Sequence, residues 1–171
     1  LLDDGLRVRL RVVLQCRAEA LDTAKSNLGR AKVRAEVASF FDDIPERLAK
    51  ASLVICRSGA STIAELAVVG RPALLVPFPH ATDNHQTANA EGLCDAGGGW
   101  IVQQDAFTPE VLAERLSSLL RLGPTLTVAA RCSHQMGKPE ATAQLSDLVV
   151  EVVTGNGNGD GEDVNPQEVA A

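Results

Sequence analysis

The chain has 171 residues, which is enough for one domain with a substantial hydrophobic core but few for two such domains. Aromatic residues make up only 3% of the sequence, which argues against a nucleic-acid surface built on stacked bases. The formal net charge is −6, but residues 155–171 supply four acidic residues and no basic one, so 16 basic and 18 acidic residues remain in 1–154. This balance gives no sign of polyanion binding, and we expect no nucleic-acid partner.

The C-terminal residues, the cysteines and the apolar runs further limit the domain organisation and the class of protein. Residues 154–171 are rich in Gly, Asn and acidic side chains and cannot form a core, so the sequence predicts a folded domain at 1–153 and a disordered tail after it. The four cysteines are widely spaced and form no CxxC pair, which predicts reduced, structural thiols in a cytosolic protein. No apolar run approaches the roughly 18 residues that span a membrane.

The predicted elements alternate between strands and helices. In chain order they are strand 10–16, helix 18–28, strand 33–40, helix 42–51, strand 52–56, helix 61–70, strand 72–78, helix 84–96, strand 99–103 and helix 108–123, with one or two more helices up to about residue 153. Gly29 is expected to close the first helix, Asp42 or Asp43 to cap the second, and Thr108 to cap the helix at 108–123. This alternation, with continuously apolar strands, predicts an α/β fold with a parallel sheet covered by helices on both faces.

Two turns of this predicted sheet, at 57–60 and 77–84, open at the same edge, and each leads into the N-terminus of a helix. Ligands of open α/β sheets bind in the crevice at that edge, and helix N-termini favour anions. The pair of turns therefore predicts a site for a phosphorylated small molecule.

The first turn holds Ser58, Gly59 and Ala60, whose small side chains allow backbone N–H groups to approach a phosphate closely. Small residues are also common in any tight turn from strand to helix, and on this motif alone a structural role is favoured. Glu65 is open to two interpretations as well. Thr62 and Glu65 have the spacing of a capping box, and on spacing alone this structural role is favoured. In the alternative interpretation the Glu65 carboxylate accepts hydrogen bonds from two ribose hydroxyls.

The second turn is followed by Gln86 and Asn89, which lie three residues apart on one face of a helix. Their amides suit sugar hydroxyls, because each amide offers donors and an acceptor. His80, His85 and Asp83 match no standard metal-site spacing, so no metal is predicted here.

Phe40 and Phe41 follow the predicted strand 33–40 and so lie at the same sheet edge. They could flank a flat base, or they could pack in the core, which is the default for Phe. The residues alone leave this choice open.

Two strings together, RSGAxTxxEL at 57–66 and PxPHx(4)HQxxNA at 77–90, resemble the C-terminal half of the MurG family. The resemblance covers roughly residues 10–150. It implies a Rossmann-like C-terminal domain of a GT-B glycosyltransferase, which holds the donor UDP-N-acetylglucosamine and needs neither a metal nor another cofactor.

The resemblance also implies residue roles. Glu65 would bind the ribose hydroxyls, Phe41 would offer its backbone to the uracil edge, and Phe40 would lie beside the base. The remaining implied donor contacts are Ser58, Gly59 and Ala60 at the diphosphate, and Gln86, Asn89 and neighbouring His85 at the sugar. No catalytic residue is expected in this chain.

The reaction implied by the family is an inverting transfer of N-acetylglucosamine to lipid I, which gives lipid II for peptidoglycan synthesis. In the family this takes place at the cytoplasmic face of the cell membrane, where an N-terminal domain binds the acceptor and the membrane surface. That domain and a GGSQGA-like loop would precede Leu1, so the chain is expected to be a fragment or one half of a split enzyme, inactive alone. Two alternatives are a non-catalytic UDP-sugar-binding module that acts with a separate partner, and another transferase or an epimerase that uses a UDP-sugar.

Overall fold

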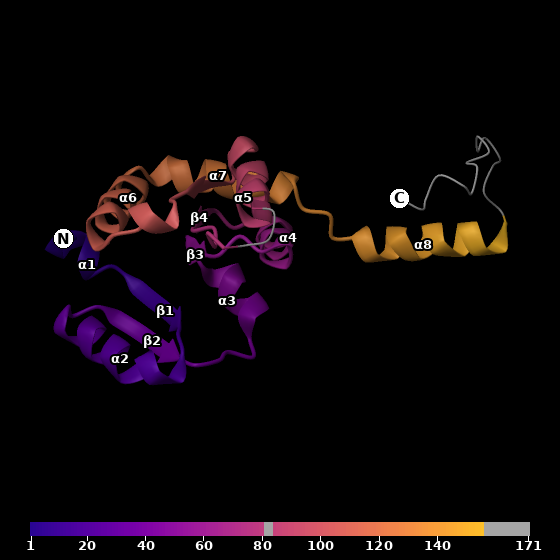
Figure 1. Ribbon diagram of the computed structural model, residues 1–171. Helices are drawn as coiled ribbons and strands as arrows, with labels where there is room; N and C mark the ends of the chain where they lie inside the picture. Colours follow the sequence, from indigo (N-terminus) through magenta and orange to yellow (C-terminus); the bar gives the residue numbers. More distant parts are fainter. Residues whose placement is uncertain (81–83, 156–171) are drawn as a thin grey trace. The chain divides into compact units, whose positions relative to one another are not determined.

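A computed structural model describes residues 1–80 and 84–155 of the chain (Figure 1). The chain divides into two units, Leu1–Gly137 and Lys138–Ala171. Most of the predicted tail, from residue 156 on, and residues 81–83 of the second turn lie outside the described residues.

The first unit alternates strands and helices along its length. Its elements are α1 (Asp4–Arg7), β1 (Arg11–Gln15), η1 (Ala18–Ala20), α2 (Leu21–Arg30), β2 (Arg34–Ala38), α3 (Ile44–Lys50), β3 (Val54–Cys56), α4 (Ala60–Val69), β4 (Ala73–Leu75), α5 (His85–Asp95), β5 (Gly99–Ile101), η3 (Gln104–Ala106), α6 (Pro109–Arg121) and α7 (Gly123–Gln135). The predicted order of elements is confirmed. Each strand is shorter than predicted at one or both ends.

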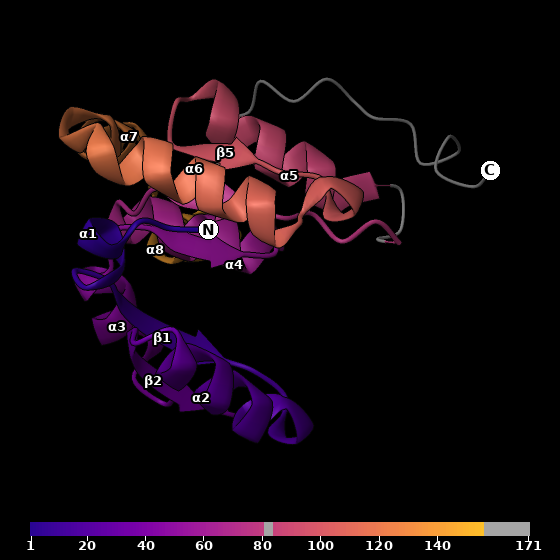
Figure 2. The same ribbon diagram turned by 90° about the vertical axis from the view of Figure 1, so that its left-hand side faces the viewer.

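All strand pairs are parallel, as the α/β prediction required. β1 pairs with β2, with Val13 opposite Glu36, while β4 lies between β3 and β5, with Leu74 opposite Ile55 and Trp100. The five strands thus form a two-stranded and a three-stranded sheet. Helix α2 packs along β2, as Figure 2 shows, and α5 packs along β5. Because all three strands of the larger sheet run the same way, their carboxyl ends lie at one edge.

The core lies between the three-stranded sheet and helices α4 and α5. Five fully buried side chains form it: Leu66, Ala73, Leu75, Ala90 and Leu93. Strand β4 is buried throughout because it is the central strand, which explains its continuously apolar sequence. This core fixes the strand ends from which the candidate site is built.

Several helix ends follow the sequence signals. The Thr108 side chain accepts a hydrogen bond from the Val111 N–H at 3.3 Å and caps α6 as predicted. Gly70 ends α4 with a left-handed φ of 68°. The prediction for Gly29 was wrong, because α2 continues through it to Arg30 and the left-handed residue is Lys32, with a φ of 55°.

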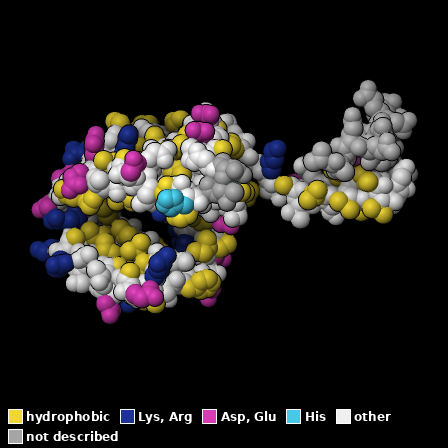
Figure 3. Space-filling view, viewed as in Figure 1, with side chains coloured by type: hydrophobic (Ala, Val, Ile, Leu, Met, Phe, Trp, Pro, Cys, Tyr) yellow, Lys and Arg dark blue, Asp and Glu magenta, His cyan; other side chains and the backbone are white. Residues whose placement is uncertain are grey.

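The described part of the second unit is dominated by helix α8 (Ala141–Thr154), which ends at Gly155 in the left-handed conformation. Its residues are all exposed, and Val152 and Val153 are 72% and 79% accessible. The apolar side chains are visible on this helix in Figure 3. Within residues 1–80 and 84–155, no helix is both long and apolar enough to cross a membrane.

Candidate functional site

The candidate site is at the carboxyl edge of the three-stranded sheet. After β3, residues 57–59 turn directly into α4, whose N-cap is Gly59 in an extended conformation. The N–H groups of Ala60, Ser61 and Thr62 lie in the first helical turn, where no acceptor exists within the helix. This turn therefore presents backbone donors and the positive end of a helix dipole at the sheet edge.

Two side-chain hydrogen bonds join this turn to the start of α5. The Ser58 Oγ donates to the carbonyl oxygen of Gln86 at 2.7 Å, and the Asn89 Nδ2 donates to the carbonyl oxygen of Ser58 at 3.1 Å. Ser58 is fully buried, so its hydroxyl is a structural group between the two turns. We call this pair of bonds the Ser58 bridge. It holds the two turns at a fixed spacing.

The Gln86 side chain faces the second turn. Its Oε1 accepts a hydrogen bond from the Phe78 N–H at 3.0 Å, which ties α5 to the segment after β4. Asn89 uses its amide nitrogen in the Ser58 bridge. Each amide therefore has one end fixed by the protein, with the Nε2 of Gln86 and the Oδ1 of Asn89 as the remaining polar groups. His85 is the first residue of α5 and is exposed.

Glu65 lies in the interior of α4, not at its start. The helix begins at Ala60, so Thr62 is already inside the first turn and cannot be the N-cap of a capping box. The capping interpretation is therefore wrong. The Glu65 side chain is exposed, and within the described residues it forms no hydrogen bond or ion pair.

Arg57 is a residue that the sequence analysis did not single out. Its guanidinium donates to the carbonyl oxygens of Val76 and Pro77 at 3.0 and 3.1 Å, and it lies 5.6 Å from the ring centroid of Phe78. This cation links the ends of β3 and β4. Its position directly after a predicted strand was the available signal.

Phe40 and Phe41 lie in different environments. Phe40 is 72% exposed, whereas Phe41 is only 7% exposed. The guanidinium of Arg47, on α3, lies 3.8 Å from the Phe41 ring centroid. The sequence alone left core packing and base contact open, and the structure assigns packing to the Phe41 ring.

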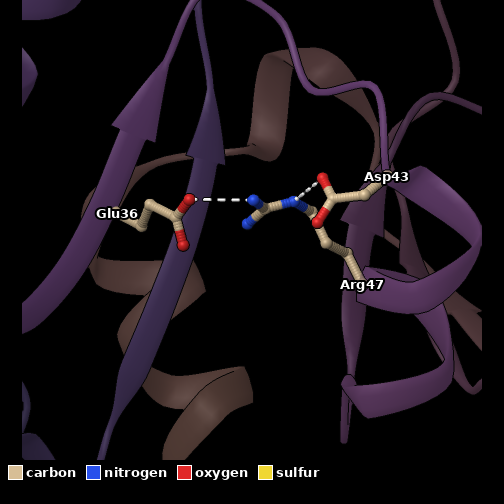
Figure 4. Close-up of polar contacts among 3 residues, drawn as sticks. All are labelled: Glu36, Asp43 and Arg47. Carbon is tan, nitrogen blue, oxygen red and sulfur yellow. Dashed lines mark hydrogen bonds and ion pairs between the residues drawn. The ribbon is translucent and has the colours of Figure 1, made fainter.

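Arg47 also forms two ion pairs, shown in Figure 4. It donates to Glu36 on β2 at 2.8 Å and to Asp43 at 2.5 Å. The hydrogen bond from Arg47 lowers the pKa of each carboxyl below its ordinary value. The pKa of Arg47 is raised, mainly by its hydrogen bond to Glu36 and then by its hydrogen bond to Asp43. Asp43 is the N-cap residue of α3, as predicted, but its side chain bonds to Arg47 and makes no cap hydrogen bond.

A depression of about 410 Å³ lies at the same edge and is lined by Pro79, Gln103, Gln104 and Asp105. None of these four residues was predicted from the sequence as a ligand contact. In the described parts of the chain, no three His, Cys, Asp or Glu side chains gather in a way that could hold a metal ion. Burial raises the pKa of Cys56 and of Cys94 to about 11, which makes both thiols poor nucleophiles at neutral pH.

The fold is that of a glycosyltransferase C-terminal domain. The crystal structure of Acinetobacter baumannii MurG is similar with a TM-score of 0.77 and 35% identity, over 83% of this chain and 43% of that chain. Glycosyltransferase VinC in complex with DTDP shares the fold alone, with a TM-score of 0.62 and 20% identity, over 90% of this chain and 44% of that one.

The chain belongs to the glycosyltransferase family 28 C-terminal domain family, whose model matches residues 3–145. A Rhodospirillum rubrum protein named UDP-N-acetylglucosamine--N-acetylmuramyl-(pentapeptide) pyrophosphoryl-undecaprenol N-acetylglucosamine transferase is 52% identical over 149 residues, 87% of this chain and 38% of that protein. A Rhodospirillum centenum protein of the same name is 50% identical over 93% of this chain and 42% of its own length. The resemblance to the MurG family is confirmed, and the chain spans about two fifths of the length of these relatives.

Proposed function

We propose that this chain is the donor-binding half of an inverting glycosyltransferase that moves N-acetylglucosamine from UDP-N-acetylglucosamine to lipid I, forming lipid II. The observation that carries the proposal is the Ser58 bridge, which sets an open helix N-terminus beside the amide-bearing face of α5. The names of relatives about 50% identical support the choice of donor and acceptor.

In this proposal the diphosphate lies at the start of α4. Gly59 and Ala60 offer backbone N–H groups there, and the helix dipole stabilises the negative charge that grows on the departing UDP. Ser58 contributes through its backbone and through the bridge, since its hydroxyl is already donated to Gln86. Backbone donors and a helix dipole are sufficient to stabilise this leaving group, so no metal is needed in this half.

The nucleoside and the sugar have separate contacts. The exposed carboxylate of Glu65 accepts from the two ribose hydroxyls, the main chain of Phe41 contacts the uracil edge, and the exposed ring of Phe40 lies beside the base. The free ends of the Gln86 and Asn89 amides contact N-acetylglucosamine hydroxyls, with His85 next to them.

The chemical step needs an acceptor hydroxyl aimed at the sugar carbon that bears UDP, and a base within hydrogen-bond reach of that hydroxyl. In this proposal both come from the part of the protein that binds lipid I at the cytoplasmic membrane face. This chain supplies the orientation of the donor and the stabilisation of the leaving group.

Calorimetry with UDP and with 2′-deoxy-UDP tests the proposal on the wild type, Glu65→Gln and the matched control Glu114→Gln, an exposed acid on α6. A hydrogen bond to a charged group contributes about 1.5–3 kcal/mol, so Glu65→Gln should weaken UDP binding by about tenfold or more. Removal of the 2′-hydroxyl should weaken binding to the wild type and leave the variant nearly unaffected. Equal UDP affinity for the wild type and Glu65→Gln would remove Glu65 from the site, and no UDP binding by the wild type would contradict donor binding.

A further inference from the structure

The segment between β2 and α3 has no regular hydrogen bonding of its own. Within residues 1–80 and 84–155, the N–H and C=O groups of Phe40 and Phe41 make no hydrogen bond. Backbone groups of a nearly buried residue such as Phe41 are normally paired. These groups therefore have no hydrogen-bond partner among the described residues, and something other than a backbone ladder must hold them in place.

Arg47 provides that hold. Its guanidinium stacks 3.8 Å from the Phe41 ring centroid and is itself fixed by Asp43 from one side and by Glu36 of β2 from the other (Figure 4). The planar fork of arginine can stack and form two ion pairs at once, which lysine cannot do. Stacking of a cation on an aromatic ring adds a further attraction between the Arg47 guanidinium and the Phe41 ring. Because Glu36 and Asp43 fix the Arg47 guanidinium and the guanidinium stacks on the Phe41 ring, the main chain at Phe41 is restricted.

We propose that Arg47 is a positioning residue that sets the nucleobase selectivity of the donor site, by fixing the main-chain N–H and C=O of Phe41. The inference rests on the proposed function and deepens it. Uracil presents an N3–H donor beside the O4 acceptor, whereas cytosine presents an N3 acceptor beside an amino donor. A fixed C=O and N–H pair matches the uracil edge and opposes the cytosine edge at both positions. The site discriminates uracil from cytosine only if the main chain at Phe41 is unable to rotate and accommodate both bases.

The test is calorimetry on the full 171-residue chain with UDP and CDP. The variants are Arg47→Ala, Arg47→Lys and Glu36→Gln, and the matched control is Arg30→Ala, whose guanidinium donates to Asn27 on α2. Arg47→Ala should reduce the preference for UDP over CDP about tenfold, or about 1.4 kcal/mol, mainly by weakening UDP. Arg47→Lys should reduce it nearly as much, Glu36→Gln by about two- to threefold, and Arg30→Ala not at all.

The selectivity ratio separates positioning from a general structural role, because loss of folded protein lowers the binding of both nucleotides equally. An unchanged ratio in Arg47→Ala would overturn the inference. Should that variant fail to fold, an unchanged ratio in Glu36→Gln, which changes one partly exposed partner, would overturn it instead. A wild type that binds UDP and CDP equally well would end this inference and leave donor binding standing, whereas a wild type that binds neither would end both.

Discussion

Ser58 shows how one small side chain can join the two turns of the candidate site. Its hydroxyl is fully buried and donates to the Gln86 carbonyl, while its own carbonyl accepts from Asn89. Ser58→Ala would leave the Gln86 carbonyl without that donor, at a cost of about 1–2 kcal/mol in the free energy of unfolding. The matched control is Ser61→Ala, because Ser61 is exposed in the next turn and should change stability by less than about 0.5 kcal/mol. Urea unfolding measures both, and equal stability of the two variants would show that the bridge does not stabilise the fold.

The individual site residues were only partly predictable. The small residues at 58–60 predicted the tight turn from β3 into α4, and the amides at 86 and 89 lie on the helix predicted for them, because turn and helix signals are local in sequence. One end of each amide is fixed by a contact outside α5, with Phe78 for Gln86 and with Ser58 for Asn89, and spacing within one helix cannot reveal such contacts. Arg47 was missed for the same reason, since its partner Glu36 lies on β2, eleven residues earlier.

At the scale of the elements, the close approach of β4 and β5 depends on Gly99. A Cβ at Gly99 would lie 2.7 Å from the backbone oxygen of Ala73, and backbone cannot move aside cheaply. We expect Gly99→Ala to destabilise the protein by about 1–3 kcal/mol, because the two strands must separate.

Gly92 provides the control, since it lies within α5 and a Cβ there would meet nothing within 4 Å. Gly92→Ala should stabilise the protein by about 0.5–1 kcal/mol, through the helix propensity of alanine and the lower entropy of the unfolded chain. Thermal or urea unfolding of both variants should therefore show shifts of opposite sign. A Gly99→Ala variant as stable as the wild type would contradict the strand-contact argument.

Helix and strand identities were predictable because periodicity and caps are local. Thr108 with Pro109 gave the start of α6, and Gly70 gave the end of α4. The start of α4 was placed too late, since Gly59 in an extended conformation serves as N-cap without a side chain. The division of five strands into two sheets depends on which strands form hydrogen bonds with each other, and alternation in the sequence does not carry that information.

At the scale of the whole molecule, the second unit begins at Lys138. The sequence predicts helices up to about residue 153 within one folded domain, and α8 is the last of these helices. In the structure its leucines and valines are exposed, Leu145 by 62% and Leu148 by 55%. Burial depends on a contacting surface, which the sequence of the helix alone does not specify. The domain limits at 1–153 stay a prediction.

The relatives named as transferases are more than twice as long as the region they share with this chain. Transfer requires the donor and the acceptor hydroxyl to be held together, and a donor site by itself gives only binding. We therefore expect the 171-residue chain to bind UDP-N-acetylglucosamine without transferring its sugar to a lipid I analogue. A chimera should restore transfer, if the part of the Rhodospirillum rubrum relative that precedes the shared region is joined to this chain. Release of UDP and formation of the lipid-linked disaccharide measure both proteins, and the Glu65→Gln chimera, with weakened donor binding, is the control for use of this site. Sugar transfer by the chain alone would contradict the proposal that it is the donor-binding half.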